Sequence, residues 1–369
     1  MKIMNRKWLA LVLALVMSLS LIGCGDSSSS SAPSFDSSSL LEGKLISVIG
    51  DSISTFDGIN NNPAINPTLE GHAVYYTEGR YDMSPSDTWW QQTADALGAE
   101  ILVNNSWSGS CVLVDNKGPD SASYGIRSEN LHDTQGRTPD IVVIYMGTND
   151  FDTVKDSFGD PLAVNYGTLL NADGTHGTPE TFCEAYALML AKVKYHYPDA
   201  EIYCMNILDR RSLLGDKTEI DAFNGYIETI AAASGAYLVD IYRDSGIGAD
   251  SVSCMTYIAD EVLHPSAAGM DAISNCLISA IYENSKFMPE ELSLCQVTYQ
   301  LDRVVIAEGT KKLVPMGSSF SCSAFDGLSF AGLDVSVKMN GKDITEKCVE
   351  NGKVTIENVT GDIEIIAEK

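Results

Sequence analysis

The sequence has few cations for its length. Its 369 residues include 24 Lys and Arg against 50 Asp and Glu, which gives a formal net charge of −26. An acidic surface disfavours binding to nucleic acid, whose phosphates attract Lys and Arg, and it also disfavours electrostatic docking on anionic lipid. The composition therefore excludes a polyanion-binding protein and favours a neutral substrate.

The sequence also has no motif for a metal or redox centre. None of its nine cysteines lies in a C-x-x-C pair, no H-E-x-x-H occurs, and Val154 breaks the calcium-loop pattern that begins at Asp150. Several of the eight cysteines that follow Cys24 fall in apolar segments, where a cysteine is often a small core residue. We therefore predict no metal site, no cofactor and no particular disulfide.

The one long apolar run lies at the N-terminus. It covers residues 8–22, follows three cations, and leads into Leu-Ile-Gly-Cys at 21–24. The run is short for a membrane span and ends abruptly, as a signal peptide does. Residues 1–24 resemble the signal peptide and lipobox of bacterial lipoproteins, which implies cleavage before Cys24 and a lipid on that cysteine.

This resemblance predicts an extracytoplasmic protein held at the membrane through Cys24. Removal of residues 1–23 takes away three cations and no acid, so the net charge becomes −29. The serine-rich residues after Cys24 predict a flexible tether, which we assign to 24–42.

Residues 43–286 alternate apolar strands with helical periodicities. Strands that are apolar throughout and separated by helices predict a mainly parallel sheet covered on both faces, a three-layer α/β/α sandwich. A threonine, a proline and an acid at 178–180 predict the start of one helix, Pro198 its end, and 88–97 and the residues after Ser266 predict two more. The predicted strands are 45–49, 101–104, 141–146, 202–207 and 237–241.

The pattern changes after residue 286. Apolar and polar residues alternate at 333–340, 353–357 and 363–365, with an Asn-Gly turn at 340–341. No helix-length period appears. Residues 293–369 therefore predict a small all-β domain, which resembles the immunoglobulin-like modules of secreted bacterial enzymes and serves either as a spacer or in carbohydrate binding.

A serine follows the first predicted strand. Residues 50–54 are Gly-Asp-Ser-Ile-Ser, directly behind the apolar run 45–49. A strand that ends in glycine turns abruptly and presents the next side chains at the carboxyl edge of the sheet, where ligands bind in α/β folds. Ser52 is thus a candidate nucleophile. The alternative is a purely structural role in which this serine caps a following helix. The stretch is not an α/β-hydrolase nucleophile elbow, because Ser54 replaces the final glycine of G-x-S-x-G.

Three later stretches also contain candidate functional residues, and two of them follow predicted strands as Ser52 does. Residues 104–110 follow the second strand, Gly-Thr-Asn-Asp at 147–150 ends the third, and Glu-Val-Leu-His-Pro at 261–265 lies near the end of the α/β pattern. Together with 50–54, they resemble in order and spacing the four blocks of the SGNH (GDSL-type) hydrolase and esterase family. The resemblance spans roughly residues 45–285 and implies a flavodoxin-like fold and a serine esterase.

The resemblance also implies the catalytic roles. Ser52 would be the nucleophile and His264 its base, while the backbone N–H groups of Ser52 and Gly109 and the side-chain amide of Asn149 would form the oxyanion hole. The other four histidines, at 72, 132, 176 and 196, lie in polar or helical surroundings that favour a surface or packing role.

The acid that orients His264 has two candidates. The family commonly has an aspartate three residues before the histidine, whereas this sequence has Glu261 there and Asp260 one place earlier. Glu261 keeps the register, and Asp260 keeps the side-chain type but needs a bulge. We favour Glu261, because triads of this kind accept either acid.

These patterns predict an esterase that removes a short acyl group, with acetyl favoured, from a carbohydrate. Aromatic residues around the first two blocks could stack on sugar rings, although at least one of Trp89 and Trp90 should be core, which leaves Trp107 as the candidate pocket wall. The alternatives are a lipase, lysophospholipase or thioesterase acting near the membrane, or a surface protein that binds carbohydrate through its β domain. The aromatic residues around the first two blocks, which we call the aromatic cluster, are Tyr75, Tyr76, Tyr81, Trp89, Trp90 and Trp107.

Overall fold

The structure is a computed structural model that describes residues 35–113, 121–123, 125–209, 217–260 and 262–369. The predicted signal peptide, the lipidation site at Cys24 and the candidate acid Glu261 lie outside these residues. The prediction of a lipid anchor therefore stays a prediction.

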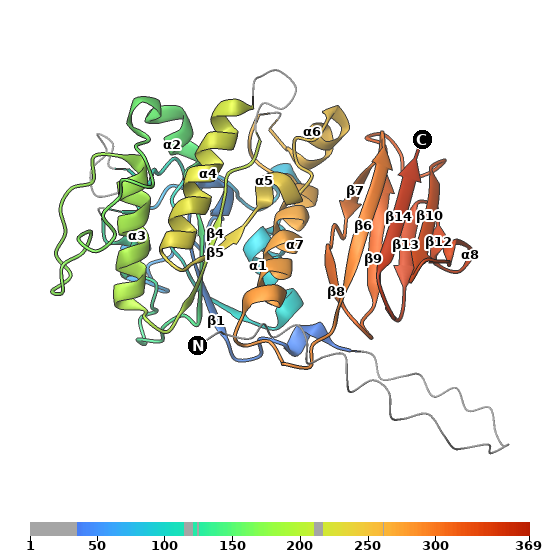
Figure 1. Cartoon of the computed structure of the whole chain (residues 1–369), viewed down its shortest axis with the longest axis horizontal. Coiled ribbons are helices and arrows are strands. Elements are labelled where there is room, and N and C mark those ends of the chain that lie inside the picture. Colours follow the sequence, from blue (N-terminus) through green and yellow to red (C-terminus); the bar gives the residue numbers. More distant parts are fainter. Residues whose placement is uncertain (1–34, 114–120, 124, 210–216, 261) are drawn as a thin grey trace, which may run out of the picture. The chain divides into compact units, whose positions relative to one another are not determined.

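A parallel sheet forms the centre of the N-terminal part (Figure 1). Its strand order is β2-β1-β3-β4-β5, and every neighbouring pair is parallel. The five strands begin and end within two residues of the predicted bounds. They are β1 (Leu45–Gly50), β2 (Glu100–Asn104), β3 (Ile141–Tyr145), β4 (Glu201–Met205) and β5 (Tyr237–Val239).

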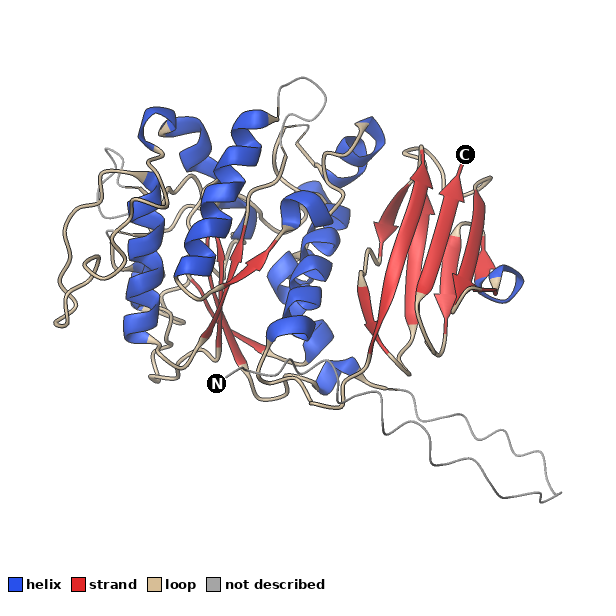
Figure 2. Ribbon diagram, in the orientation of Figure 1, coloured by secondary structure: helices blue, strands red, loops and turns tan. Residues whose placement is uncertain are grey.

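Helices cover both faces of this sheet (Figure 2). Along β3, Ile141, Val143 and Tyr145 belong to one apolar cluster, with residues of α1 and α7, whereas Val142 and Ile144 belong to another, with α3 and α4. This alternation confirms the predicted three-layer α/β/α sandwich. The helices are α1 (Trp89–Leu97), α2 (Thr148–Thr153), α3 (Phe182–His196), α4 (Thr218–Ala233), α5 (Ile241–Asp244), α6 (Ser251–Tyr257) and α7 (Ala267–Asn284).

The predicted helix starts are correct for α1 and α7 and wrong for α3. Thr88 and Ser266 are the N-caps of α1 and α7. Helix α3 begins three residues later than predicted, because Thr181 and Glu184 form a capping box in which each side chain accepts the other's backbone N–H. Two satisfied backbone donors outweigh the proline signal at Pro179.

The C-terminal part is all β apart from one short helix, as predicted. One sheet has the order β11-β10-β14-β6-β8 and the other β12-β13-β9-β7, and alternate strand residues form an apolar cluster of their own. Asn340 and Gly341 both have positive φ, as expected for the predicted Asn-Gly turn. The elements are β6 (Leu294–Asp302), β7 (Val305–Glu308), β8 (Leu313–Pro315), β9 (Phe320–Phe325), β10 (Asp334–Met339), β11 (Lys342–Asp343), α8 (Thr345–Cys348), β12 (Val349–Glu350), β13 (Lys353–Ile356) and β14 (Ile363–Glu368).

The β strands after residue 293 bond to the α/β part. The Tyr257 hydroxyl donates to the carbonyl of Ile306 at 2.6 Å, and the Asp271 carboxylate accepts from the N–H of Gly309 at 2.8 Å. Residues 34–369 accordingly form one compact unit. The sequence did not indicate these contacts, because they depend on side chains that α6 and α7 present to strand β7 and the turn after it.

Part of the segment that we assigned to the tether belongs to the fold. Leu41 is fully buried and its N–H donates to the Leu97 carbonyl, while the N–H of Phe35 donates to the Gly317 carbonyl. Any tether therefore ends before Phe35, and the folded chain begins near the end of the sheet where β1 starts (Figure 1).

Candidate active site

The strand order places three predicted site residues beside one another. Strand β1 lies between β2 and β3, and the chain leaves all three strands at the same edge. Ser52 follows β1, Gly109 follows β2, and Asn149 lies in the first turn of α2 after β3. The Trp107 N–H donates to the Gly50 carbonyl at 3.1 Å, which joins the loop after β2 to the end of β1.

A tight turn carries Ser52. Residues Ser52–Ser54 form a single 3₁₀ turn, and the buried Asp51 caps it by accepting the N–H of Ile53 at 3.0 Å. A Cβ at Gly50 would lie 2.3 Å from Ser54 Oγ and 2.8 Å from Ser106 Oγ. Glycine is therefore required at position 50, where the end of β1 approaches Ser54 and Ser106 closely. This requirement supports the functional interpretation of the 50–54 stretch.

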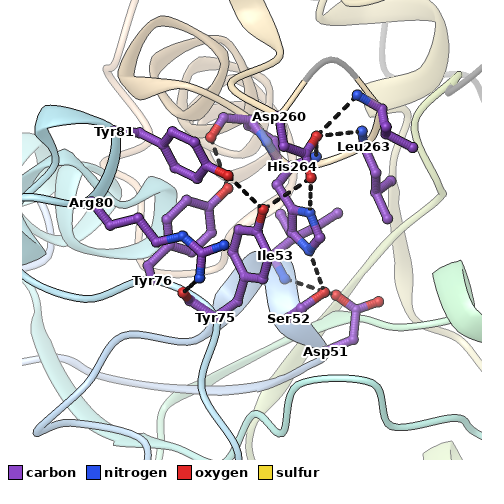
Figure 3. Close-up of polar contacts among 12 residues, drawn as sticks. Asp51, Ser52, Ile53, Tyr75, Tyr76, Arg80, Tyr81, Asp260, Leu263 and His264 are labelled. Atoms are coloured by element: carbon purple, nitrogen blue, oxygen red, sulfur yellow. Dashed lines mark hydrogen bonds and ion pairs between the residues drawn. The ribbon is translucent and has the colours of Figure 1, made fainter.

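Ser52, His264 and Asp260 form a chain of hydrogen bonds (Figure 3). Ser52 Oγ lies 2.9 Å from His264 Nε2, and His264 Nδ1 lies 2.5 Å from Asp260 Oδ2. A carboxylate on Nδ1 holds the proton there and leaves Nε2 free to accept the serine proton. The arrangement has the geometry of a nucleophile with its base and orienting acid.

The acid beside His264 is Asp260, which differs from our preference for Glu261. Asp260 reaches the ring because its Oδ1 accepts the backbone N–H groups of Val262, Leu263 and His264, at 2.8 to 3.0 Å, and so wraps the loop around the carboxylate. This turn supplies the bulge that the shorter side chain needs. Family register alone could not predict it.

Asp260 is held in its ionised form. Burial raises the pKa of its carboxyl, but the N–H of Leu263, the His264 ring and the N–H groups of His264 and Val262 outweigh burial, so the pKa lies well below its ordinary value. The carboxylate thus stays charged across the range in which a histidine works as a base.

The two other predicted oxyanion residues follow β2 and β3, the strands on either side of β1. Gly109 has φ +78°, a left-handed conformation that favours glycine, and a Cβ there would meet no atom within 4 Å. The Asn149 Nδ2 donates to the Ser110 carbonyl at 2.9 Å, which fixes the amide beside the loop that carries Gly109. The amide carries a second N–H for which an anionic oxygen is a suitable acceptor.

Asp150 anchors that same loop. Both carboxylate oxygens accept the N–H of Val112, at 2.9 and 3.0 Å, and one accepts the N–H of Leu113 at 2.9 Å. Full burial raises the pKa of Asp150 to about 7 against the opposing effect of these bonds. The sequence placed Asp150 beside Asn149 but gave no sign of its partners.

Arg127 is a supporting residue that the sequence analysis missed. Its side chain is 3% exposed and donates to the carbonyls of Gly50 and Asn105 and to Ser110 Oγ, at 2.7 to 2.9 Å. One guanidinium therefore ties the end of β1 to the loop after β2. A lone arginine between two motifs has no local signal that would have predicted this role.

The aromatic cluster divides into core and site. Trp89 and Trp90 are fully buried, as the helix pattern indicated for at least one of them. Trp107 is half-buried, and His72 stacks on it with ring centroids 4.2 Å apart. Burial lowers the pKa of His72 to about 4, with help from Arg127, so His72 is a neutral packing residue as expected.

The described residues contain no metal-ligand cluster, no disulfide and no membrane-spanning helix. In the part of the chain that the structure describes, no three His, Cys, Asp or Glu side chains come together as a metal site would require. The eight cysteines after Cys24 are all thiols. Of the helices within the described ranges, none has both the length and the apolar character to cross a membrane.

Solved structures resemble the chain at low identity. A candidate GDSL-like lipase from Bacteroides ovatus is 26% identical with a TM-score of 0.41, over 65% of this chain and 99% of that one. A second from Bacteroides uniformis is 23% identical with a TM-score of 0.44, over 65% and 96%. An acetylxylan esterase from Geobacillus stearothermophilus is 17% identical with a TM-score of 0.43, over 68% and 99%. No curated protein sequence matches the chain.

The family model for GDSL-like lipases and acylhydrolases matches residues 44–228. The match covers half of the chain and contains the turn at Ser52, Gly109 and Asn149, while His264 and Asp260 follow it. The chain thus belongs to the GDSL-like lipase/acylhydrolase family, and it is a serine ester hydrolase.

Proposed function

We propose that the protein is an extracytoplasmic esterase that removes short acyl groups, acetyl above all, from carbohydrate. The observation that carries the proposal is the series of hydrogen bonds from Ser52 Oγ through His264 to Asp260. Ser52 follows β1 at the same edge of the sheet where the segments with Gly109 and Asn149 begin. Membership of the family supports ester hydrolysis, and the geometry supports the roles proposed for these residues.

In the proposed mechanism, Ser52 Oγ attacks the ester carbonyl carbon as its proton passes to His264 Nε2. Asp260 stabilises the imidazolium that forms. The carbonyl oxygen becomes an oxyanion, which would accept the N–H groups of Ser52 and Gly109 and the free amide hydrogen of Asn149.

Collapse of this intermediate breaks the bond to the leaving oxygen. His264 returns the proton to that oxygen, so an alcohol departs and the acyl group stays on Ser52. Water then repeats the sequence with His264 as the base, which releases the acid and restores the serine.

Polar groups of the proposed site support a small acyl group and a hydroxylic leaving group. They include the Asn149 amide, which donates to the Ser110 carbonyl, and the Tyr75 hydroxyl, which donates to Asp260. Tyr81 is 37% exposed and Trp107 is half-buried, so part of each aromatic side chain is accessible to a sugar. The net charge of −26 further favours a neutral glycan over an anionic lipid.

The entry point of the chain bears on the choice between glycan and membrane lipid. The Leu41 N–H bonds to the Leu97 carbonyl, and β1 starts four residues after Leu41, whereas Ser52 follows the other end of β1. A lipid on Cys24 would precede Phe35 by a stretch that spans at most about 40 Å when fully extended. A tether attached at that end would leave Ser52 accessible to surrounding polysaccharide, which supports the glycan assignment.

The test compares three substrates with the chain that lacks residues 1–24. Acetylated xylo-oligosaccharide, 4-nitrophenyl octanoate and a lysophospholipid are incubated with wild type and with Ser52→Ala. We expect acetate release from the oligosaccharide, little turnover of the other two, and loss of all activity in the variant. Faster turnover of the lysophospholipid would overturn the glycan assignment and support the lipase alternative.

A further inference from the structure

Tyr75 contacts both members of the His264–Asp260 pair. Its ring stacks on the imidazole with centroids 3.4 Å apart and an interplanar angle of 8°. Its hydroxyl donates to Asp260 Oδ2 at 2.9 Å, the same oxygen that accepts from His264 Nδ1. One side chain, from the loop between β1 and α1, thus constrains both the base and its acid (Figure 3).

Arg80 covers the other face of the Tyr75 ring. Its guanidinium carbon lies 3.9 Å from the ring centroid, and its Nη1 donates to the Tyr75 carbonyl at 2.6 Å. Arg80, Tyr75 and His264 therefore form a three-layer stack, which Figure 3 shows with Tyr75 in the middle. Because both faces of Tyr75 are covered, its ring is not a platform for a sugar.

A third residue completes the network. The hydroxyls of Tyr81 and Tyr75 lie 2.9 Å apart. The single proton of Tyr75 goes to Asp260, so the Tyr81 hydroxyl must donate to Tyr75. The donors run in one direction, from Tyr81 to Tyr75 to Asp260, and each bond polarises the next.

The backbone that places Tyr81 is strained. Tyr81 has φ +57° and Asp82 has φ +56°, two consecutive left-handed residues with side chains. Each costs on the order of 1–2 kcal/mol relative to the right-handed conformation. Strain of this kind persists where the surrounding structure enforces it, and it gathers at functional sites.

We propose that Tyr75 is a positioning residue that holds His264 and Asp260 in register, with Arg80 and Tyr81 fixing Tyr75 from the far side. The inference rests on the proposed catalytic roles of Ser52, His264 and Asp260. The Tyr75 hydroxyl takes part of the negative charge of Asp260 that would otherwise stabilise protonated His264, and the Arg80 cation opposes that protonation as well. The stack therefore keeps His264 available as a base under acidic conditions.

The charged and titratable groups around the imidazole come from three segments. Asp260 lies on the loop of His264 itself, and Asp51 stands beside Ser52. The loop before α1 contributes Tyr75, Tyr76, Arg80 and Tyr81, of which Tyr76 meets the imidazole edge-on and stays a neutral phenol. The two carboxylates favour protonated His264, whereas Arg80 disfavours it. Burial raises the pKa of Tyr75, and its bonds with Tyr81 and Asp260 add to this, so the phenol stays a neutral donor throughout.

The test measures the reactivity of Ser52 with diisopropyl fluorophosphate as a function of pH. This reagent phosphorylates an activated serine: an Oγ–P bond forms, the P–F bond breaks to release fluoride, and the serine proton passes to His264. The rate therefore reports on His264 as a base without any carboxylic ester substrate. Tyr75→Phe removes the hydroxyl and keeps the stack, and Arg80→Met removes the charge and keeps much of the length. Tyr76→Phe is the matched control, because the Tyr76 hydroxyl donates to the Pro265 carbonyl and not to Asp260.

We expect the acidic limb of the rate profile to move upward by about 0.5 pH unit in Tyr75→Phe, since a hydrogen bond to a charged group is lost. Arg80→Met should move it in the same direction by less, because Arg80 is exposed and solvent screens its charge. Tyr76→Phe should leave the limb in place. Tyr75→Leu, which also removes the stack, should slow the plateau rate by roughly 10- to 100-fold.

Unchanged limbs in Tyr75→Phe and Arg80→Met, with a wild-type plateau rate in Tyr75→Leu, would overturn the positioning role. Tyr75→Phe decides the question alone if Tyr75→Leu fails to fold. Wild type that reacts at Ser52 but hydrolyses no ester would instead contradict the proposed function, and the shifts among variants would still be measurable.

Discussion

Ser52 and His264 are 212 positions apart, and their side chains meet at 2.9 Å. Ser52 follows strand β1, which lies between β2 and β3, whereas His264 precedes α7, the helix that packs with α1 on one face of the sheet. The contact therefore depends on the docking of the last helix of the α/β part. Nucleophile and base come together only when the whole sandwich has formed.

Asp260→Asn should lower kcat for 4-nitrophenyl acetate by about 10³- to 10⁴-fold, because the amide cannot stabilise the imidazolium and favours the wrong histidine tautomer. Glu261→Gln is the matched substitution one residue along, and it should retain most of the activity. Steady-state kinetics of the two variants decide which acid serves His264. A greater loss in Glu261→Gln would show that Glu261, the position favoured by the family pattern, orients His264.

Asn149→Ala should reduce kcat by about 10²- to 10³-fold with little change in KM, because the amide would bind the oxyanion more strongly than the ground-state carbonyl. Asn284→Ala is a suitable control, since that amide also bonds a backbone carbonyl, that of Ala280, but lies on the exposed end of α7. Equal kinetics for the two variants would remove Asn149 from the oxyanion hole.

Arg127→Met should destabilise the protein by about 2–4 kcal/mol, because it leaves buried carbonyls at Gly50 and Asn105 without this donor. Urea unfolding measures the change. Arg137→Met removes ion pairs of a side chain that is 43% exposed, one to the exposed Glu100 and one to the largely buried Asp133, and it should cost less, about 1 kcal/mol. Equal losses would show that Arg127 does not stabilise the sheet edge.

His72→Phe should make the protein less sensitive to acid. The pKa of His72 is lowered from 6.5 to about 4 in the folded state, so the unfolded chain binds a proton first as the pH falls. Stability from this group is complete above pH 6.5 and is lost between pH 6.5 and about 4. Phenylalanine keeps a ring against Trp107 but cannot titrate.

The measurement is Tm across that pH range, compared with wild type and with His176→Phe in a distant loop. His72→Phe should show the smaller fall in Tm between pH 6.5 and 4, whereas His176→Phe should follow wild type. Parallel curves for all three proteins would exclude His72 as the acid-sensitive group.

The sequence predicted most of the sheet and much of the site. Apolar runs predicted the five strands, because a strand of a parallel sheet that is covered on both faces is apolar at nearly every position. Ser52 was predictable for the same reason, since it directly follows such a run. His264 was predicted through its motif, which spans only a few residues.

Two roles could not be predicted because they depend on distant contacts. Arg127 and Tyr75 gain them only when loops that are far apart in the sequence meet. Two other differences are local. The Asp260 carboxylate accepts three backbone N–H groups of its own loop, and a reciprocal cap at Thr181 outweighs the proline signal at the start of α3. Where two local signals compete, the sequence does not show which of them forms.

The central claim is that Ser52 carries the acyl group during turnover. The most direct measurement is peptide mass spectrometry of the protein after acid quenching of a reaction with 4-nitrophenyl acetate. The account predicts one acetyl group on the peptide that contains Ser52, and neither acetylation there nor turnover in Ser52→Ala. An acetyl group on another residue, or undiminished turnover in Ser52→Ala, would contradict it.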